Sequence, residues 1–360
     1  MSISILVYDS IVASPGSNRF HERGYVYIEA GRVKGVGAGE PPAELEAANL
    51  VAGGEGRVAL PGLVSAHTHL LLYPLRHVLE HGDPANTGLA ARLVEVIGER
   101  EAYLLATLSL YELTLHGVTV VQASDVHAPA VWRAMRDAGV DGLVGVLVGC
   151  RYSSRGWREE LETLLEARAR AALVVCDEGL LGEAIRVAKE AGVPLYTHPP
   201  AGGGDMVMHA SRGTGARVRV YVPVPGGAPP EPPVGIGLDA VSISSVLRAS
   251  MVAAWQGLGY DAALLAATRW GAEALGLEGG VIEPGSPAHL VVYDVSLPPG
   301  IPPRRDTLAR LLLDIEPRVE LVVANGSPIV DQGEHITIPR SRVEEAARLA
   351  ARLLEELKPS

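Results

Sequence analysis

The chain has 360 residues, of which 48% are hydrophobic and 20% are charged. This composition excludes a wholly disordered protein and predicts a globular chain of roughly two domains. The 31 Lys and Arg residues against 42 Asp and Glu residues give a formal net charge of −11. That balance excludes the basic surface of a typical nucleic-acid or anionic-membrane binder.

The segment 1–60 is predicted to form short strands, because β-branched residues alternate with polar ones between glycines. From 61 to 278, buried-strand runs such as VTVVQAS alternate with amphipathic helical stretches, which is typical of a parallel sheet, open or closed into a barrel. Strands return in 279–340, and 341–360 carries the apolar stripe of a C-terminal helix. We expect the two strand-rich ends to combine into one small β-domain beside the central α/β domain.

The cysteines and the N-terminus favour a cytoplasmic location. Cys150 and Cys176 are too few for a disulfide framework, so a reducing compartment is the expectation. The first residues, MSISILVYDS, lack the basic start and the cleavage site of a signal peptide. No apolar run reaches the ~18 residues that a membrane span needs.

The strongest local motif is PGLVSAHTH at 61–69, which contains His67 and His69. Side chains alternate across a strand, so both imidazoles face the same side. At the carboxyl end of a barrel strand, that side is where catalytic groups gather. Two polar residues at a strand end are the alternative interpretation, and partners elsewhere in the chain favour a metal site instead.

Four stretches resemble the amidohydrolase superfamily, in particular its cytosine-deaminase-like and triazine-hydrolase-like branch. PGLVSAHTHL is similar to the first-strand motif, LYTHP with His198 to the fifth-strand motif, and GIGLDAVS with Asp239 to the eighth-strand motif. GGVIEPGSPAHLVVYDV is similar to the segment that begins the C-terminal part of the family's β-sandwich, with His289 where Asp is usual. The motifs occur in the expected order and span almost the whole chain.

The resemblance implies a TIM-type (β/α) barrel at 61–278. It also implies a small β-sandwich formed by 1–60 and 279–340. One Zn²⁺ or Fe²⁺ would be bound by His67, His69, His198 and Asp239, a ligand mix that suits either metal. Metal-bound hydroxide would be the nucleophile and Asp239 the proton shuttle. The implied activity is hydrolysis of a non-peptide C–N bond in a small cyclic compound, by a deaminase or a cyclic amidohydrolase.

The two-metal branch of the superfamily needs a lysine at the end of the fourth strand. The stretch 171–178, AALVVCDE, has none. Cys176 or Glu178 could bridge two metals instead, but a buried structural cysteine and a surface carboxylate are the favoured interpretations. A serine or cysteine hydrolase is disfavoured, because the chain has no G-x-S-x-G motif.

The likeness breaks after the fifth strand. Deaminases of this branch have HxxE there, and Ala201 stands at the place of the proton-transferring glutamate. Asp205 is the nearest substitute. Only 41 positions separate His198 from Asp239, which is too short for three regular crossovers, so we expect a barrel shortened after strand five. A hairpin of DMVMHAS with ARVRVYVPV is one way to arrange this region.

Three further residues are predicted to lie at the site. His209 corresponds to the family's sixth-strand histidine, which polarises water or substrate, although a surface histidine is the alternative. Asp125 and His127 follow the second strand and are predicted, with Asp205, to contact a small-molecule substrate. A degenerate relative with a binding or assembly role is the alternative function, and a homodimer is the default expectation.

Overall fold

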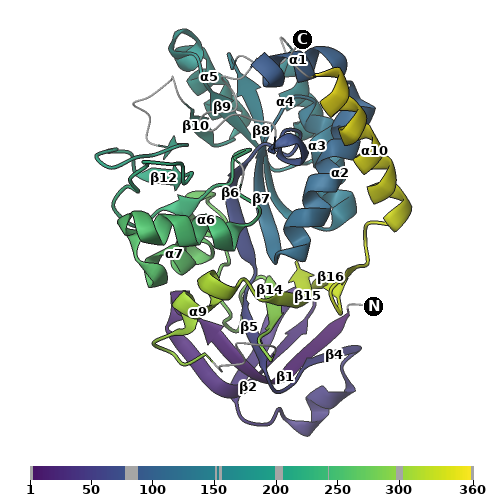
Figure 1. Cartoon of the computed structure of the whole chain (residues 1–360), viewed down its shortest axis with the longest axis vertical. Helices are drawn as coiled ribbons and strands as arrows, with labels where there is room; N and C mark the ends of the chain where they lie inside the picture. The colour runs from purple at the N-terminus through teal and green to yellow at the C-terminus, as the bar shows by residue number, and fades with distance from the viewer. Residues whose placement is uncertain are drawn as a thin grey trace.

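The computed structural model describes residues 3–77, 88–150, 152–153, 156–198, 206–241, 243–296 and 303–357. An α/β unit built around a parallel sheet lies above a second, separate sheet (Figure 1). The chain passes from the lower sheet into the upper unit at Gly62. A Cβ at this position would lie 2.3 Å from Oγ1 of Thr119. Only glycine therefore lets the chain at position 62 lie this close to the strand that contains Thr119.

The lower sheet draws on both ends of the chain, as predicted. Among the described residues its strands follow the order β17-β16-β15-β14-β5-β1-β2-β3, and β4 pairs with β1. Strands β5 and β14 join the two halves as antiparallel neighbours. The apolar side chains of these strands enclose a core of their own. The N-terminal strands are β1 (Ser4–Ser14), β2 (Arg19–Glu29), β3 (Arg32–Ala38), β4 (Leu50–Gly53) and β5 (Arg57–Pro61), and the C-terminal ones are β14 (Leu290–Asp294), β15 (Arg318–Ala324), β16 (Ser327–Asp331) and β17 (Glu334–His335).

The upper sheet is a parallel array of eight strands among the described residues, in the sequential order β6 to β13. Its first strands are continuous apolar runs, and every residue of β6, β7 and β9 is buried, as helices on the outside of a barrel require. The strands are β6 (Leu63–Thr68), β7 (Val118–Ser124), β8 (Asp141–Val148), β9 (Ala171–Val175), β10 (Leu195–Thr197), β11 (Met206–Val207), β12 (Val218–Tyr221) and β13 (Gly235–Ile236).

The barrel is nearly closed, because the chain after β13 returns to β6. The backbone N–H of Asp239 donates to the carbonyl of His67 at 2.9 Å, and the N–H of His69 donates to the carbonyl of Asp239 at 3.1 Å. Thr68 and Asp239 form an isolated parallel bridge. The first and last motifs of the barrel are therefore joined by backbone hydrogen bonds.

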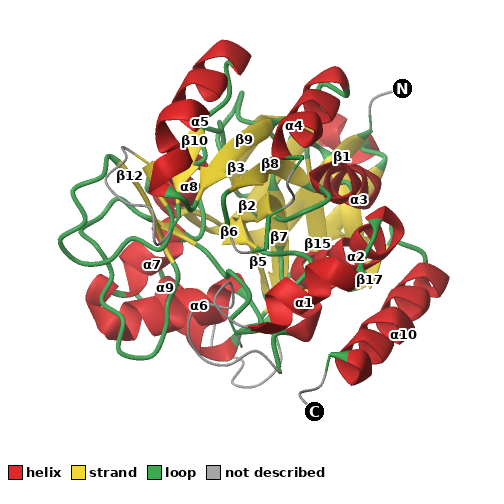
Figure 2. Cartoon of the chain, turned by 90° about the horizontal axis from the view of Figure 1, so that it is seen from above, coloured by secondary structure: helices red, strands yellow, loops and turns green. Residues whose placement is uncertain are grey.

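Helices α2 to α5 pack around strands β7 to β10, and α10 packs on α2 (Figure 2). Local signals fix their ends. The carboxylate of Asp177 accepts the N–H of Gly179 at 2.7 Å where α5 begins, and Gly139, with φ of +78°, ends α3. The helices are α1 (Gly88–Val96), α2 (Glu99–Leu115), α3 (Ala128–Ala138), α4 (Trp157–Glu166), α5 (Glu178–Ala191), α6 (Val246–Ala253), α7 (Tyr260–Ala266), α8 (Arg269–Ala274), α9 (Leu308–Ile315) and α10 (Arg340–Glu356).

The region after β10 is abbreviated. None of the described residues in 206–241 is helical, and β11 and β12 are only two and four residues long. The hairpin interpretation is wrong, because Met206 and Val218 are parallel partners. A two-residue strand is only about 7 Å long, so the loop between β11 and β12 can return along it without a helix.

No helix within the described part of the chain combines the length and the apolar character that crossing a membrane requires.

Candidate active site

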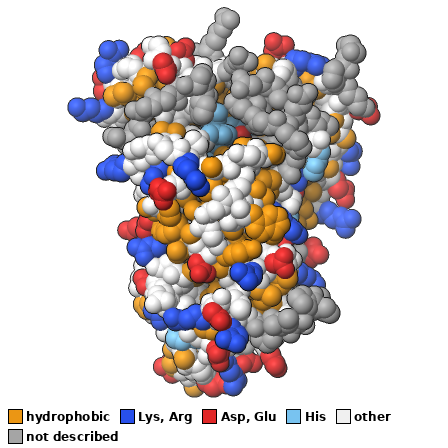
Figure 3. Space-filling model, turned by 60° about the vertical axis from the view of Figure 1, so that its left-hand side comes forward, with side chains coloured by type: hydrophobic (Ala, Val, Ile, Leu, Met, Phe, Trp, Pro, Cys, Tyr) orange, Lys and Arg blue, Asp and Glu red, His pale blue; other side chains and the backbone are white. Residues whose placement is uncertain are grey.

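Four histidines and one aspartate converge at the carboxyl ends of the barrel strands. They follow or end β6, β10, β11 and the last strand, β13, and four of the five are fully buried. The exception is His209, whose side chain is 16% exposed. Figure 3 shows histidine side chains in a hollow near the upper end of the molecule. The five residues are His67, His69, His198, His209 and Asp239.

The H-x-H pair has the geometry that strand alternation predicts. The rings of His67 and His69 lie on one side of β6, with centroids 4.9 Å apart. The centroid of the His198 ring is 5.3 Å from that of His67 and 6.1 Å from that of His69. The three predicted imidazole ligands therefore lie together.

Asp239 is held in register with this pair by the backbone bonds that close the barrel. Its Oδ1 lies 3.2 Å from Nε2 of His69. Gly237, in the GIGLD stretch, makes the approach possible, because a Cβ there would lie 2.9 Å from Cβ of His67. Asp239 itself has φ of +52°, a left-handed conformation that aspartate tolerates better than most residues and that is common at functional sites.

His209 also reaches the site. Its ring centroid is 4.5 Å from that of His198, and its Nε2 lies 3.5 Å from Oδ2 of Asp239. Two triplets have ligand atoms that all lie within 4.8 Å of one another: His67, His198 and His209, and His67, His69 and Asp239. His67 belongs to both triplets, so the cluster is continuous.

Hydrogen bonds on the far side of two rings aim the remaining nitrogens into the cluster. Nδ1–H of His67 donates to Oε1 of Gln122 at 3.1 Å, and Nδ1–H of His69 donates to the carbonyl of Ser124. The amide of Gln122 donates in turn to Oγ of Ser124 at 2.7 Å. Nε2 of His67 is buried and has no hydrogen-bond partner among the described residues. A buried nitrogen lone pair without a donor fits a metal ligand.

Burial keeps these imidazoles neutral. It lowers the pKa of His67 to about 3, assisted by His198 and opposed by the bond to Gln122. The pKa values of His69 and His209 also lie well below the usual value, mainly through burial. A neutral imidazole is the form that binds a metal, so no proton has to leave these rings at neutral pH.

Asp125 is buried directly beside the cluster. Its carboxylate accepts the N–H groups of Leu70 and Leu71, at 2.7 and 3.2 Å, and its Oδ1 lies 4.0 Å from Nδ1 of His69. Burial raises the pKa of Asp125 to about 7, and the two backbone bonds oppose the shift. It thus braces the chain just after the H-x-H motif.

Nε2 of His127 lies 3.2 Å from the carbonyl oxygen of Ile97, and His127 occupies the N-cap position of α3 without a capping side-chain hydrogen bond. Ala201 and Asp205 lie outside the described residues, so the geometry of both stays open. The substrate contacts predicted for Asp125, His127 and Asp205 remain predictions.

Sequence reasoning missed two polar neighbours of the cluster, Gln122 and Tyr152. The signal for Gln122 was present, because it is an amide inside the apolar run VTVVQAS. Tyr152 gave no signal, since its role depends on a turn that brings its hydroxyl within 2.8 Å of Nε2 of His69.

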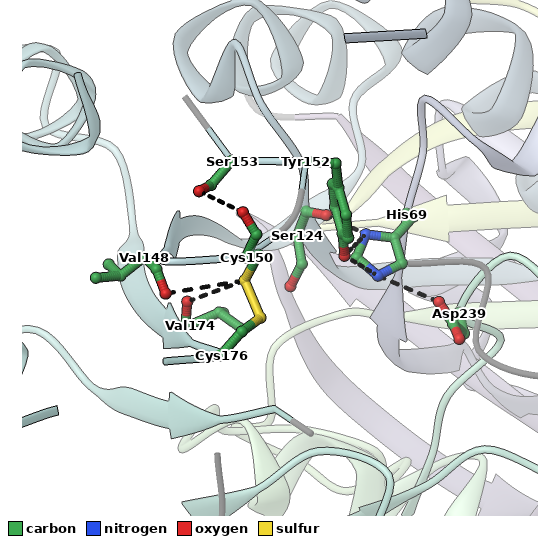
Figure 4. Close-up of a disulfide and its surroundings, with 9 residues drawn as sticks. All are labelled: His69, Ser124, Val148, Cys150, Tyr152, Ser153, Val174, Cys176 and Asp239. Carbon is green, nitrogen blue, oxygen red and sulfur yellow. Dashed lines mark hydrogen bonds and ion pairs between the residues drawn. A yellow bond between two sulfur atoms is a disulfide. The ribbon is translucent and has the colours of Figure 1, made fainter. Parts of the chain in front are cut away.

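The two cysteines are bonded to each other, contrary to the prediction of a reducing environment. Cys150 and Cys176 are buried, as expected for Cys176, but they form a disulfide with Cα atoms 4.9 Å apart (Figure 4). The two residues follow neighbouring strands, β8 and β9, and only this adjacency reveals that they can pair. The pair removes the argument that the cysteines gave for a reducing compartment.

No protein-family model matches the chain. It is 27% identical to the 5-methylthioadenosine/S-adenosylhomocysteine deaminase of Natronomonas pharaonis, over 83% of this chain and 88% of that protein. An adenosine deaminase from Xanthomonas campestris with bound zinc shares the fold, with a TM-score of 0.82, 19% identity, and coverage of 98% of this chain and 99% of that one. Atrazine chlorohydrolase TrzN from Arthrobacter aurescens TC1, complexed with zinc, has a TM-score of 0.80 and 19% identity over 96% of this chain and 100% of that one.

The similarity to the Natronomonas pharaonis deaminase supports the resemblance to the amidohydrolase superfamily. It agrees with the recognition made from the four motifs. The relative and the structural neighbours are deaminases and a metal-dependent hydrolase, which agrees with the predicted enzyme class, a hydrolase of C–N bonds in small compounds.

Proposed function

We propose that the protein is a zinc-dependent deaminase of an adenosine-type nucleoside, with His67, His69, His198 and Asp239 as metal ligands. The observation that carries the proposal is the buried cluster at the barrel mouth, in which Nε2 of His67 has no hydrogen-bond partner among the described residues. Zinc is favoured over iron because zinc is bound in the adenosine deaminase that shares the fold. The substrate class rests on the deaminase relative.

The donor set fits such an ion, because neutral imidazoles and one carboxylate are ordinary zinc ligands. A divalent metal held here would act as a Lewis acid and would make a water molecule nucleophilic near neutral pH. The protein would contribute a fixed ligand frame, since Gln122 and Ser124 orient two of the rings and backbone bonds tie Asp239 to β6.

Asp239 is the residue we assign to proton transfer. Its two oxygens lie 3.2 Å from Nε2 of His69 and 3.5 Å from Nε2 of His209, so it faces both sides of the cluster. It would take the proton of the attacking water and return it to the departing nitrogen, which leaves as ammonia. His209, which lies on the other side of Asp239 from His69, would hold the water or the purine ring by a hydrogen bond.

An ammonia-release assay tests this function. Zinc-loaded protein is incubated with adenosine, 5-methylthioadenosine, S-adenosylhomocysteine, cytosine, a triazine and a hydantoin. We expect ammonia from at least one adenine nucleoside, and a loss of about 10²- to 10⁴-fold in kcat for Asp239→Asn. His116→Gln is the matched control, because His116 caps α2 at the other end of the barrel and its Nδ1 bonds the carbonyl of Glu112. Ammonia from other compounds but from no adenine nucleoside would contradict the substrate class.

A binding or assembly role is the second candidate function. Ala201 in place of the family's glutamate and the abbreviated stretch after β10 favour it. A protein that binds zinc at the cluster but turns over none of the compounds would support this role.

The proposal also covers the domain boundaries and the oligomeric state of the protein. We assign 1–60 and 279–340 to the family's β-sandwich, 61–278 to a TIM-type barrel shortened after strand five, and 341–360 to a C-terminal helix. A homodimer completes the proposal, and a cytoplasmic location stays a prediction from the sequence that the disulfide does not support. Size-exclusion chromatography with light scattering would measure the oligomeric state.

A further inference from the structure

The Cys150–Cys176 disulfide lies at the mouth of the barrel, beside the cluster of histidines and Asp239. Cys150 follows β8 and Cys176 follows β9, so the bond joins two adjacent strands at their carboxyl ends. The two loops already touch there. A Cβ at Gly149 would lie 2.5 Å from Cβ of Asp177, and the N–H of Cys176 donates to the carbonyl of Val148 at 3.0 Å.

A tight turn connects the disulfide to the cluster. The backbone N–H and the hydroxyl of Ser153 both donate to the carbonyl of Cys150, at 3.0 and 2.8 Å. The turn therefore starts on a covalently anchored residue and carries Tyr152 at its third position. Figure 4 shows Tyr152 reaching from this turn to the ring of His69.

Tyr152 contacts His69 on the side that faces the cluster. Its side chain is buried, and its hydroxyl lies 2.8 Å from Nε2 and 3.2 Å from Nδ1 of His69. Because Nδ1–H of His69 is donated to Ser124, the hydroxyl of Tyr152 can donate only to Nε2 in the metal-free protein, and it would lie beside a metal ion bound at that nitrogen. A phenol group is thus held at the edge of the ligand set.

We propose that the Cys150–Cys176 disulfide is a positioning element of the active site, which holds the Tyr152 hydroxyl at the metal-binding face of His69. The inference rests on the proposed metal site. Without the covalent bond, Cys150 can move away from β9, and the turn moves Tyr152 with it. The disulfide therefore controls site geometry in addition to any effect on stability.

Three variants test the link: Tyr152→Phe, the disulfide-free Cys150→Ser/Cys176→Ser, and the triple variant. Loss of a polar group in the shell around a metal site typically lowers activity about 10- to 100-fold. We expect Tyr152→Phe and the disulfide-free protein to lose kcat/KM to a similar extent within this range. The triple variant should lose no more than either, since both changes remove the same contact. Multiplied losses, or an unchanged disulfide-free protein, would overturn the inference.

A second measurement does not depend on activity. In the metal-free protein labelled with ¹⁵N-histidine, the hydroxyl of Tyr152 donates to Nε2 of His69. We expect Tyr152→Phe and the disulfide-free variant to shift the His69 Nε2 resonance in the same direction. A shift in Tyr152→Phe alone would show that the turn holds its place without the bond, which contradicts the proposal.

Controls separate this test from unfolding and from failure of the proposed function. Circular dichroism below the melting temperature establishes that each variant is folded. If the Cys150→Ser/Cys176→Ser protein does not fold, the Cys150→Ala/Cys176→Ala protein takes its place. Thiol titration of the unreduced, denatured wild type should find no free thiol, and two free thiols would overturn the inference. A wild type that binds no zinc overturns the proposed function and this inference together. A zinc-binding wild type with unaffected variants overturns the inference alone.

Discussion

Gln122 illustrates how a single buried amide orients an imidazole that we propose as a metal ligand. It accepts Nδ1–H of His67 and donates to Ser124, whose carbonyl accepts Nδ1–H of His69. Ser124 also donates to Oε1 of Gln122 at 3.0 Å. One short stretch of β7 therefore orients both members of the H-x-H pair, and Gly145 leaves the space for it, because a Cβ there would lie 2.5 Å from Nε2 of Gln122.

Replacing this amide tests its role. Gln122→Leu leaves Nδ1–H of His67 without an acceptor, so we expect zinc affinity to fall about 10- to 100-fold. Gln122→Glu keeps an acceptor for His67 and one for Ser124, and should retain most of the affinity. Competition with a chromophoric chelator measures both. Equal losses in the two variants would show that packing, and not the hydrogen bond, is what His67 needs.

The convergence of the residues that we propose as ligands could be predicted at this scale, because each lies in a short local motif. His67 and His69 share a strand, and His198 and Asp239 each follow a recognisable strand run. Tyr152 and the disulfide could not be predicted, because they depend on which strand ends become neighbours.

At the scale of elements, Gly235 and Gly237 let β13 lie against β6. A Cβ at Gly235 would meet Cβ of Ala66 at 3.0 Å, and one at Gly237 would meet Cβ and the carbonyl oxygen of His67 at 2.9 and 3.1 Å. Neither neighbour is the flexible end of a side chain. The close approach of the last strand therefore requires glycine at position 237 and is favoured by glycine at position 235.

Gly237→Ala should separate β13 from β6 and carry Asp239 away from His67. Overpacking of this kind typically costs about 1–3 kcal/mol, and zinc affinity should fall with it. Gly182→Ala is the control, because Gly182 lies in α5 and a Cβ there would meet no neighbouring atom within 4 Å. Alanine at this helical position should add about 0.5–1 kcal/mol of stability. Urea unfolding measures the stability of both variants. A Gly237→Ala protein with wild-type stability and zinc affinity would contradict the role of Gly237 in closing the barrel.

The order of strands and helices up to β10 follows from apolar runs that alternate with amphipathic stretches. The part after β10 could not be assigned in the same way, because strands of two to four residues carry too short a pattern. The hairpin interpretation failed there, since a short parallel strand and a hairpin arm have the same local composition.

At the scale of the whole molecule, a contact between His289 and Asp141 joins the barrel to the lower sheet. Nε2 of His289, just before β14, lies 3.3 Å from Oδ2 of Asp141 at the start of β8, and Arg170 donates to Oδ1 at 2.6 Å. The histidine that departs from the family's usual aspartate therefore has an acidic partner. Burial alone would raise the pKa of Asp141, but His289, the Gly142 N–H and Arg170 outweigh it, and the pKa lies well below its usual range.

A carboxyl group whose pKa is lower in the folded state stabilises the fold at every pH above its pKa in the unfolded state. That stabilisation is lost as the pH falls towards its pKa in the folded state. We therefore expect Asp141→Asn to lower the free energy of unfolding by about 1–3 kcal/mol at pH 6. The difference from wild type should shrink progressively below about pH 4, where the unfolded carboxyl becomes protonated. Urea unfolding from pH 3 to 7 measures this, and a difference that grows towards low pH would contradict the assignment.

The central claim is that residues far apart along the chain meet around one metal ion, and anomalous diffraction at the zinc edge tests it most directly. Crystals of zinc-loaded protein should show one strong peak within bonding distance of His67, His69, His198 and Asp239, and the peak should disappear in His67→Ala. No peak at the cluster, or a peak elsewhere with the cluster unchanged, would contradict the account.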